Sequence, residues 1–110
     1  MFGIILFVRI IKELPLHDFW VRHADAEKPL RLWIHDCKTS TWKSIAEVKA
    51  YARSADYVGN QRWVFNIGGN KYRLVVALCL KTGFALVKFI GTHAEYDRID
   101  VLTVELGGMT

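Results

Sequence analysis

The spacing of apolar residues changes near Gln61, and this change limits the possible folds more than any other feature of the sequence. Before Gln61 the apolar residues recur at helical intervals, whereas after it they alternate with other residues, as in strands. Trp63, Phe65 and Ile67 show the alternation clearly. The pattern predicts a helical first half followed by antiparallel strands, which is an α/β (α+β) arrangement built from two layers.

Two turns divide the second half into strands. Gly68-Gly69-Asn70 predicts a hairpin turn, because these residues readily adopt positive φ. Residues 71–80 then predict a long strand, and its apolar character on much of both faces is typical of a central position in a sheet. Thr82-Gly83 turns the chain again before a last strand at residues 84–90. We therefore expect a three-stranded antiparallel meander, with one further strand at residues 8–12.

Two to three helices are expected between the first strand and Gln61. Pro15 suits the first turn of one helix, Asp25 can cap a second, and Ser44 with Glu47 forms a capping box for a third that ends near residue 52. The apolar positions expected to face the core are Leu16, Phe19, Trp20, Leu30, Trp33, Ile34, Cys37, Ile45 and Val48. Residues 54–60 are rich in turn-forming residues and should end the helical half.

The totals fit one domain that spans residues 1–110. Hydrophobic residues make up 52% of the chain and charged residues 24%, which is enough for a real core. A formal net charge of +4 and a pI near 9.2 favour an anionic partner. Cys37 and Cys79 lack the spacing of a zinc site. Two reduced thiols fit a cytoplasmic protein.

The apolar run at residues 2–8 does not predict a membrane segment. It is too short to span a bilayer, and it has neither a basic region before it nor a small-residue cleavage site after it. We interpret residues 1–7 as an N-terminal extension of the domain.

The segment Thr92-His93-Ala94-Glu95-Tyr96-Asp97 is the strongest candidate for a functional site. Thr92 and Glu95 form a capping box, which makes His93 the first residue of a short helix. Tyr96 and Asp97 follow three and four positions after His93 and share a helix face with it. A neutral imidazole beside a helix N-terminus can accept a proton near pH 7 and lies close to amides that favour phosphate.

The expected register of the hairpins brings two basic residues toward this helix. If Thr82-Gly83 is a two-residue turn, Leu80 faces Ala85 and Arg73 lies near Gly91 and Thr92. Arg73 then also lies near Phe65 or Asn66. Lys88 pairs near Ala77 on the same sheet face, which we expect to be a basic surface. A cation beside an imidazole suits phosphoryl transfer, which needs charge stabilisation and proton transfer.

Two segments of the second half of the chain resemble a known family. Residues 62–76, which read Arg-Trp-Val-Phe-Asn-Ile-Gly-Gly-Asn-Lys-Tyr-Arg-Leu-Val-Val, and residues 88–97, which include Thr-His-Ala-Glu-Tyr-Asp, resemble the HigB toxins of bacterial type II toxin–antitoxin systems. These toxins belong to the RelE/ParE superfamily. The resemblance covers residues 8–101, so residues 102–110 are interpreted as a C-terminal tail that does not touch the site.

The resemblance implies a compact RelE-like domain with a short C-terminal helix, and a ribosome-dependent mRNA interferase. In such enzymes the ribose 2′-hydroxyl attacks the adjacent phosphodiester without a metal or cofactor. The catalytic residues it implies here are His93 as acid or base, Tyr96 to orient the phosphate, Arg73 to stabilise charge, and Lys88 to help hold the RNA. The RNA-binding residues it implies are Arg62, Asn66, Asn70, Lys71 and Asp97.

Partners also follow from the resemblance. They are a cognate helix-turn-helix, HigA-like antitoxin, mRNA on the ribosome, and operator DNA contacted only through the antitoxin, with no membrane. Two alternatives remain open. One is a ParE-like, non-enzymatic toxin that inhibits DNA gyrase by protein contact, and the other is a degenerate toxin that only binds its antitoxin.

Overall fold

The computed structural model describes residues 6–106, and its centre is a five-stranded sheet with the strand order β1-β5-β4-β3-β2. The central pairs are antiparallel, and β1 joins the edge of β5 in parallel. The strands are β1 (Arg9–Ile11), β2 (Asp56–Gly59), β3 (Arg62–Ile67), β4 (Tyr72–Cys79) and β5 (Phe84–Thr92). The predicted α+β class is confirmed, and β4 is central as expected.

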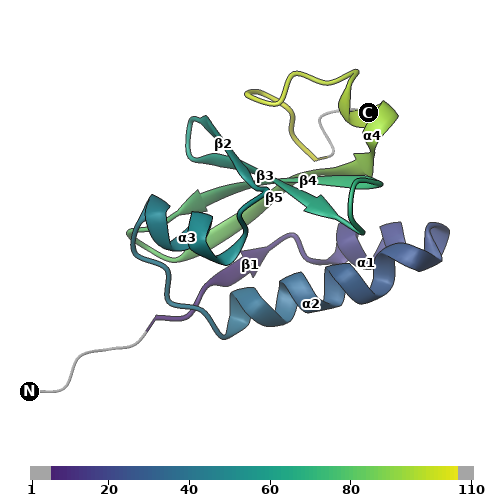
Figure 1. Cartoon of the computed structure of the whole chain (residues 1–110). Coiled ribbons are helices and arrows are strands. Elements are labelled where there is room, and N and C mark those ends of the chain that lie inside the picture. Colours follow the sequence, from purple (N-terminus) through teal and green to yellow (C-terminus); the bar gives the residue numbers. More distant parts are fainter. Residues whose placement is uncertain (1–5, 107–110) are drawn as a thin grey trace, which may run out of the picture.

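The helices of the first half of the chain lie on one side of this sheet, whereas the short last helix leads into the C-terminal segment (residues 97–106), which crosses the other side (Figure 1). The helical elements are α1 (Leu14–Arg22), the 3-10 turn η1 (Ala24–Ala26), α2 (Glu27–Lys38), α3 (Ile45–Tyr51) and α4 (His93–Tyr96). Pro15 lies in the first turn of α1, where a missing N–H costs no helical hydrogen bond. We call the two sides of the sheet the helix face and the tail face.

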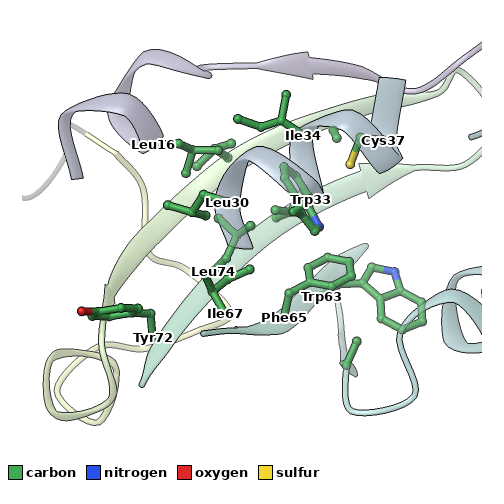
Figure 2. Packing of buried hydrophobic residues seen from close by; sticks show 14 of the residues in the cluster. Leu16, Leu30, Trp33, Ile34, Cys37, Trp63, Phe65, Ile67, Tyr72 and Leu74 are labelled. Carbon is green, nitrogen blue, oxygen red and sulfur yellow. The ribbon is translucent and has the colours of Figure 1, made fainter. Parts of the chain in front are cut away.

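Alternate residues of β3 and β4 build the core on the helix face. Trp63, Phe65, Ile67, Leu74 and Val76 are buried there. Figure 2 shows Phe65, Ile67 and Leu74 beside the apolar stripe of α2, which is formed by Leu30, Trp33, Ile34 and Cys37. The stripe is the one that the helical spacing predicts. In α3, Val48 is fully buried, but Ile45 is 49% exposed, so its predicted core contact is wrong.

Two local predictions fail because contacts from other elements decide the structure. Asp25 does not cap α2; its carboxylate accepts hydrogen bonds from Lys71 and Tyr72 instead. The turn-rich stretch before Gln61 contains β2, which pairs with β3 and turns into it through Asn60 and Gln61, both at positive φ. The antiparallel meander therefore has four strands rather than three.

The register of β4 and β5 differs in detail from the expectation. Cys79 pairs with Phe84, so residues 80–83 form the turn and Leu80 does not face Ala85. A bulge then falls at Lys88, between the pairs Val76–Val87 and Val75–Phe89, and Ala77 pairs with Leu86. Because the bulge adds a residue to β5, Arg73 still pairs with Gly91. It pairs with Asn66 on the other side, as expected.

The tail face is not the open basic surface that the sequence suggests. Val64, Val75 and Phe89 form a second buried cluster with Val104 of the C-terminal segment. Ile99 and Val101 pack against the same cluster. The C-terminal segment therefore supplies an apolar cover for the middle of this face.

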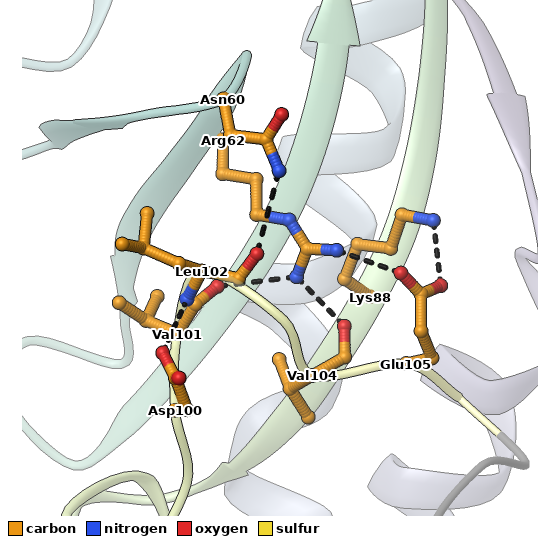
Figure 3. Close-up of polar contacts among 8 residues, drawn as sticks. All are labelled: Asn60, Arg62, Lys88, Asp100, Val101, Leu102, Val104 and Glu105. Carbon is orange, nitrogen blue, oxygen red and sulfur yellow. Dashed lines mark hydrogen bonds and ion pairs between the residues drawn. The ribbon is translucent and has the colours of Figure 1, made fainter.

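Arg62 fixes the cover in place. Its guanidinium donates hydrogen bonds to the carbonyl oxygens of Val101, at 3.1 Å, and Val104, at 2.7 Å, and it pairs with Glu105 at 2.7 Å. Figure 3 shows this fan of contacts around a guanidinium that lies beneath the segment. The side chain is only 5% exposed, so the arginine is part of the protein interior.

We expect Arg62→Met to lower the free energy of unfolding by about 2 kcal/mol, because two buried carbonyl groups lose a charged donor while the aliphatic volume is kept. Urea unfolding followed by circular dichroism measures the change. Arg53→Met is the matched control, since Arg53 is exposed and makes no side-chain hydrogen bond in residues 6–106. Equal stability of the two variants would contradict the anchoring role.

Candidate active site at the start of α4

The capping box predicted for residues 92–95 is present and fixes the start of α4. The Thr92 hydroxyl accepts a hydrogen bond from the Glu95 amide at 3.1 Å, and the Glu95 carboxylate accepts one from the Thr92 amide at 2.8 Å. His93 is therefore the first helical residue, directly after the end of β5. Its position is dictated by local sequence.

Gly91 allows β5 to reach this point. A Cβ atom at residue 91 would lie 2.5 Å from Cζ of Phe89 and 3.0 Å from the Glu95 carboxylate. The ring of Phe89 thus occupies the space that a side chain would need. The same ring packs against Tyr96, with 6.4 Å between ring centroids. Glycine at this position lets Phe89 support the helix.

The His93 side chain is half exposed, and its backbone is pinned to β4. Its Nδ1 atom lies 3.3 Å from a carboxylate oxygen of Asp97, one helical turn later. Its backbone N–H donates to the carbonyl oxygen of Lys71 at 3.0 Å. The contact with Asp97 can orient the ring and leaves Nε2 as the free nitrogen.

Arg73 lies in the sheet beside this helix and is only 9% exposed. Its guanidinium donates to the Asn70 side-chain oxygen at 2.6 Å, and to the carbonyl oxygens of Asn70 and Tyr72 at 3.2 Å each. In residues 6–106 no carboxylate forms an ion pair with it. The arginine is held by neutral groups and keeps a full uncompensated charge.

Tyr96 is the third member of the group, and charges of opposite sign nearby affect the pKa of its phenol. Burial raises the pKa of its phenol, and the negative charge of Asp56 raises this pKa further, while the positive charge of Arg73 lowers it. The phenol therefore keeps its proton at neutral pH and can donate a hydrogen bond. Asp56, in β2, is a site neighbour that sequence reasoning missed, because its strand was read as a turn.

Two of the predicted RNA-binding residues, Asn70 and Lys71, bind other side chains of the protein. Asn70 holds the guanidinium of Arg73, and Lys71 pairs with Asp25. The hydrogen bond from Lys71 lowers the pKa of the Asp25 carboxyl, and the bond from Tyr72 lowers it further. Asn66 is exposed opposite Arg73, where its side chain is free to meet a ligand.

Lys88 and Arg62 both meet the C-terminal segment. Lys88 is 16% exposed and pairs with Glu105 at 2.7 Å, next to the Arg62–Glu105 pair. The expectation that residues beyond 101 do not touch the site is wrong for residues 102–106. Residues 1–5 of the predicted extension and 107–110 of the tail lie outside the described residues. No sequence signal marked Glu105, because its two partners come from distant strands.

Within residues 6–106, no three His, Cys, Asp or Glu side chains gather as a metal site would require. Over the same residues, no helix is long and apolar enough to cross a membrane.

The α+β fold is that of a RelE-like domain, and comparison with known families agrees. The model of the HigB toxin family, described as the RelE-like toxic component of a toxin–antitoxin system, matches residues 26–99. The chain belongs to this HigB toxin family. The match includes α2, the meander and α4, and it ends at residue 99, near the start of the C-terminal segment. A search of curated proteins gives no match.

We expect Asp56→Asn to lower the pKa of Tyr96, because removing a nearby negative charge makes the phenolate easier to form. Since burial persists, the pKa should remain above that of an exposed tyrosine. NMR titration of ¹³Cζ-labelled tyrosine reports the value residue by residue. Asp18→Asn, on an exposed part of α1, is the control and should leave Tyr96 unchanged. An unaltered Tyr96 titration in Asp56→Asn would show that Asp56 does not act on the phenol.

Proposed function

We propose that this toxin is a metal-independent endoribonuclease that cleaves translated mRNA on the ribosome. The observation that carries the proposal is the buried guanidinium of Arg73, which has no carboxylate partner in residues 6–106 and acts on Tyr96 of the helix that His93 begins. Burying an uncompensated charge is costly. A bound phosphodiester would offset this cost, because the phosphate supplies the anion that pairs with the guanidinium.

The chemistry follows from the groups present. His93 takes the proton from the ribose 2′-hydroxyl, and the 2′-oxygen attacks the adjacent phosphorus. The P–O5′ bond breaks, and the departing 5′-oxygen takes up a proton from water while His93 returns its own proton to the solvent, leaving a 2′,3′-cyclic phosphate and a 5′-hydroxyl. Arg73 stabilises the additional negative charge on the phosphoryl oxygens. Tyr96, protonated, donates a hydrogen bond that orients the phosphate, and Asp97 orients His93.

The role of Lys88 in this proposal is limited by its ion pair with the C-terminal segment. Its ammonium group is paired with Glu105. An RNA phosphate that approaches Lys88 therefore competes with a carboxylate, whereas a phosphate that approaches Arg73 does not. We assign charge stabilisation to Arg73 and only RNA holding to Lys88, together with the exposed amide of Asn66.

The family assignment supplies an antitoxin as partner. We propose that this antitoxin is a HigA-like helix-turn-helix protein, that operator DNA is reached only through it, and that the toxin acts in the cytoplasm. A non-enzymatic, gyrase-inhibiting toxin would have no need for Arg73 and His93 together.

The first test is primer extension on a defined message in a purified translation system. Wild type should cleave within the translated frame when ribosomes are present, and His93→Ala should cleave about two orders of magnitude more slowly, as expected for loss of an acid–base group. His35→Ala is the control, since His35 lies on α2. A fully active His93→Ala variant would remove His93 from the mechanism. No cleavage by folded wild type would favour gyrase inhibition or a degenerate toxin.

Arg73 is tested by comparing two substitutions. Arg73→Ala should lower the cleavage rate by about 10² or more, since charge stabilisation is lost. Arg73→Lys keeps the charge but not the planar fork that bonds Asn70, so it should recover only part of the rate. Circular dichroism establishes that both variants are folded. A folded, fully active Arg73→Ala would eliminate the proposed charge stabilisation.

A further inference from the structure

A pocket of about 310 Å³ lies immediately beside the His93 site, between the end of α1 and the chain around α4. Its polar lining is Arg22, His23, Glu95 and Arg98, and its apolar wall includes Phe89. None of these residues belongs to the predicted catalytic or RNA-binding sets. The pocket therefore needs a separate explanation.

The pocket exists because β1 is short. β1 pairs with residues 84–86 of β5, so among the described residues 6–106 no strand pairs with the outer edge of β5 beyond residue 86. Phe89 and Ile90 lie on this uncovered stretch and form part of the pocket wall. An open strand edge also offers backbone N–H and C=O groups to a ligand.

Two guanidinium groups give the pocket its charge. Arg22 ends α1 and Arg98 follows α4, so segments far apart in the sequence supply them. Neither makes a side-chain hydrogen bond or an ion pair in the described chain. The one carboxylate in the lining, Glu95, already accepts the Thr92 amide of the capping box. Unpaired arginines beside a single committed carboxylate favour an anionic ligand.

A fixed, partly exposed ring lies in the same pocket. His23 stacks on Phe19 with 4.2 Å between centroids and 11° between planes. It also meets the edge of Tyr72 at 5.5 Å. Rings held in this way are suitable platforms for a nucleobase, because stacking tolerates any base.

The pocket adjoins the candidate catalytic groups through one side chain. The ring of Phe89 lines the pocket and also packs against Tyr96. An RNA chain with its scissile phosphate at Tyr96 and Arg73 can therefore place an adjacent nucleotide close to this ring.

We propose that the pocket binds the nucleotide next to the scissile phosphate of single-stranded RNA, with Arg22 and Arg98 on its phosphate and His23 against its base. The inference rests on the proposed ribonuclease function. The ring of Phe89, which lines the pocket and packs against Tyr96, favours RNA over an acidic antitoxin peptide, and peptide binding is instead an outcome of the test.

The test uses a fluorescent RNA hexanucleotide that carries 2′-O-methyl groups, so that binding is measured without cleavage. Arg22→Glu and Arg98→Glu should each weaken binding about tenfold or more. Each lost phosphate contact should also reduce the slope of log K against log salt by about 0.7. Arg53→Glu makes the same charge change at an exposed site away from the pocket and should bind within about twofold of wild type. Arg22→Gln and Arg98→Gln, which only remove the charge, should show smaller losses in the same order.

The outcomes separate this inference from the ribonuclease proposal. If the glutamate variants bind RNA as Arg53→Glu does, or if they lose only antitoxin affinity, the pocket assignment is wrong. It is also wrong if wild type does not bind the hexanucleotide. If pocket variants lose RNA affinity but folded wild type cleaves no message during translation, the pocket stands and the ribonuclease proposal fails. If the pocket variants keep both their RNA affinity and normal cleavage, the ribonuclease proposal stands and the pocket assignment fails.

Discussion

Carbonyl oxygens in the turn between β3 and β4, and in the first residue of β4, accept hydrogen bonds from the two groups that matter most in the candidate site. Asn70 and Tyr72 accept from the guanidinium of Arg73, and Lys71 accepts from the backbone of His93. Asp25 in turn accepts from the side chains of Lys71 and Tyr72. Through this turn, η1, β4 and α4 support one another, so a shift in any of them changes the distance between cation and imidazole.

The C-terminal segment is attached to the tail face by ion pairs of Glu105, by hydrogen bonds from Arg62 and by the buried Val104. The hydrogen bond from Lys88 lowers the pKa of Glu105, and Arg62 lowers it further. A carboxylate whose pKa is lowered by folding contributes stability above its unfolded pKa, and this contribution is lost as the pH falls through the folded value. Glu105 is half exposed, so water screens the pairs and the contribution is small. The buried Val104 and the carbonyl contacts of Arg62 therefore carry most of the attachment of this segment.

The sequence was informative wherever neighbouring residues decide the structure. The capping box at Thr92, the stripe of α2 and the Gly68-Gly69-Asn70 turn depend on residues a few positions apart, and these are confirmed. The box predicted at Ser44 is confirmed only in part, since the Ser44 hydroxyl accepts from the Glu47 amide but the Glu47 carboxylate accepts from the Lys43 amide. Even the pairing of Arg73 with Gly91 was correct, although a longer turn and a bulge at Lys88 were needed to produce it. Local spacing could not reveal either irregularity, because their effects on the register offset one another.

What the sequence could not show are contacts whose partners come from distant segments. Asp25 looked like a helix cap because its neighbours suit one, yet Lys71 and Tyr72 offer its carboxylate stronger donors. Asp56 looked like a turn residue because β2 is short and contains a glycine at positive φ. Glu105 had no local pattern at all. These residues set much of the electrostatics around the site.

The two buried arginines show how the surroundings separate a structural charge from a chemical one. Arg62 and Arg73 both lie on the tail face and are almost equally inaccessible. Arg62 is neutralised by Glu105 and satisfied by two carbonyl groups, so an added phosphate would gain little there. Arg73 is fixed by an amide and by carbonyl groups, which set its geometry without cancelling its charge. Because a preorganised charge needs no reorganisation when negative charge develops, Arg73 is the cation suited to a transition state, and Arg62 is the cation suited to stabilise the fold.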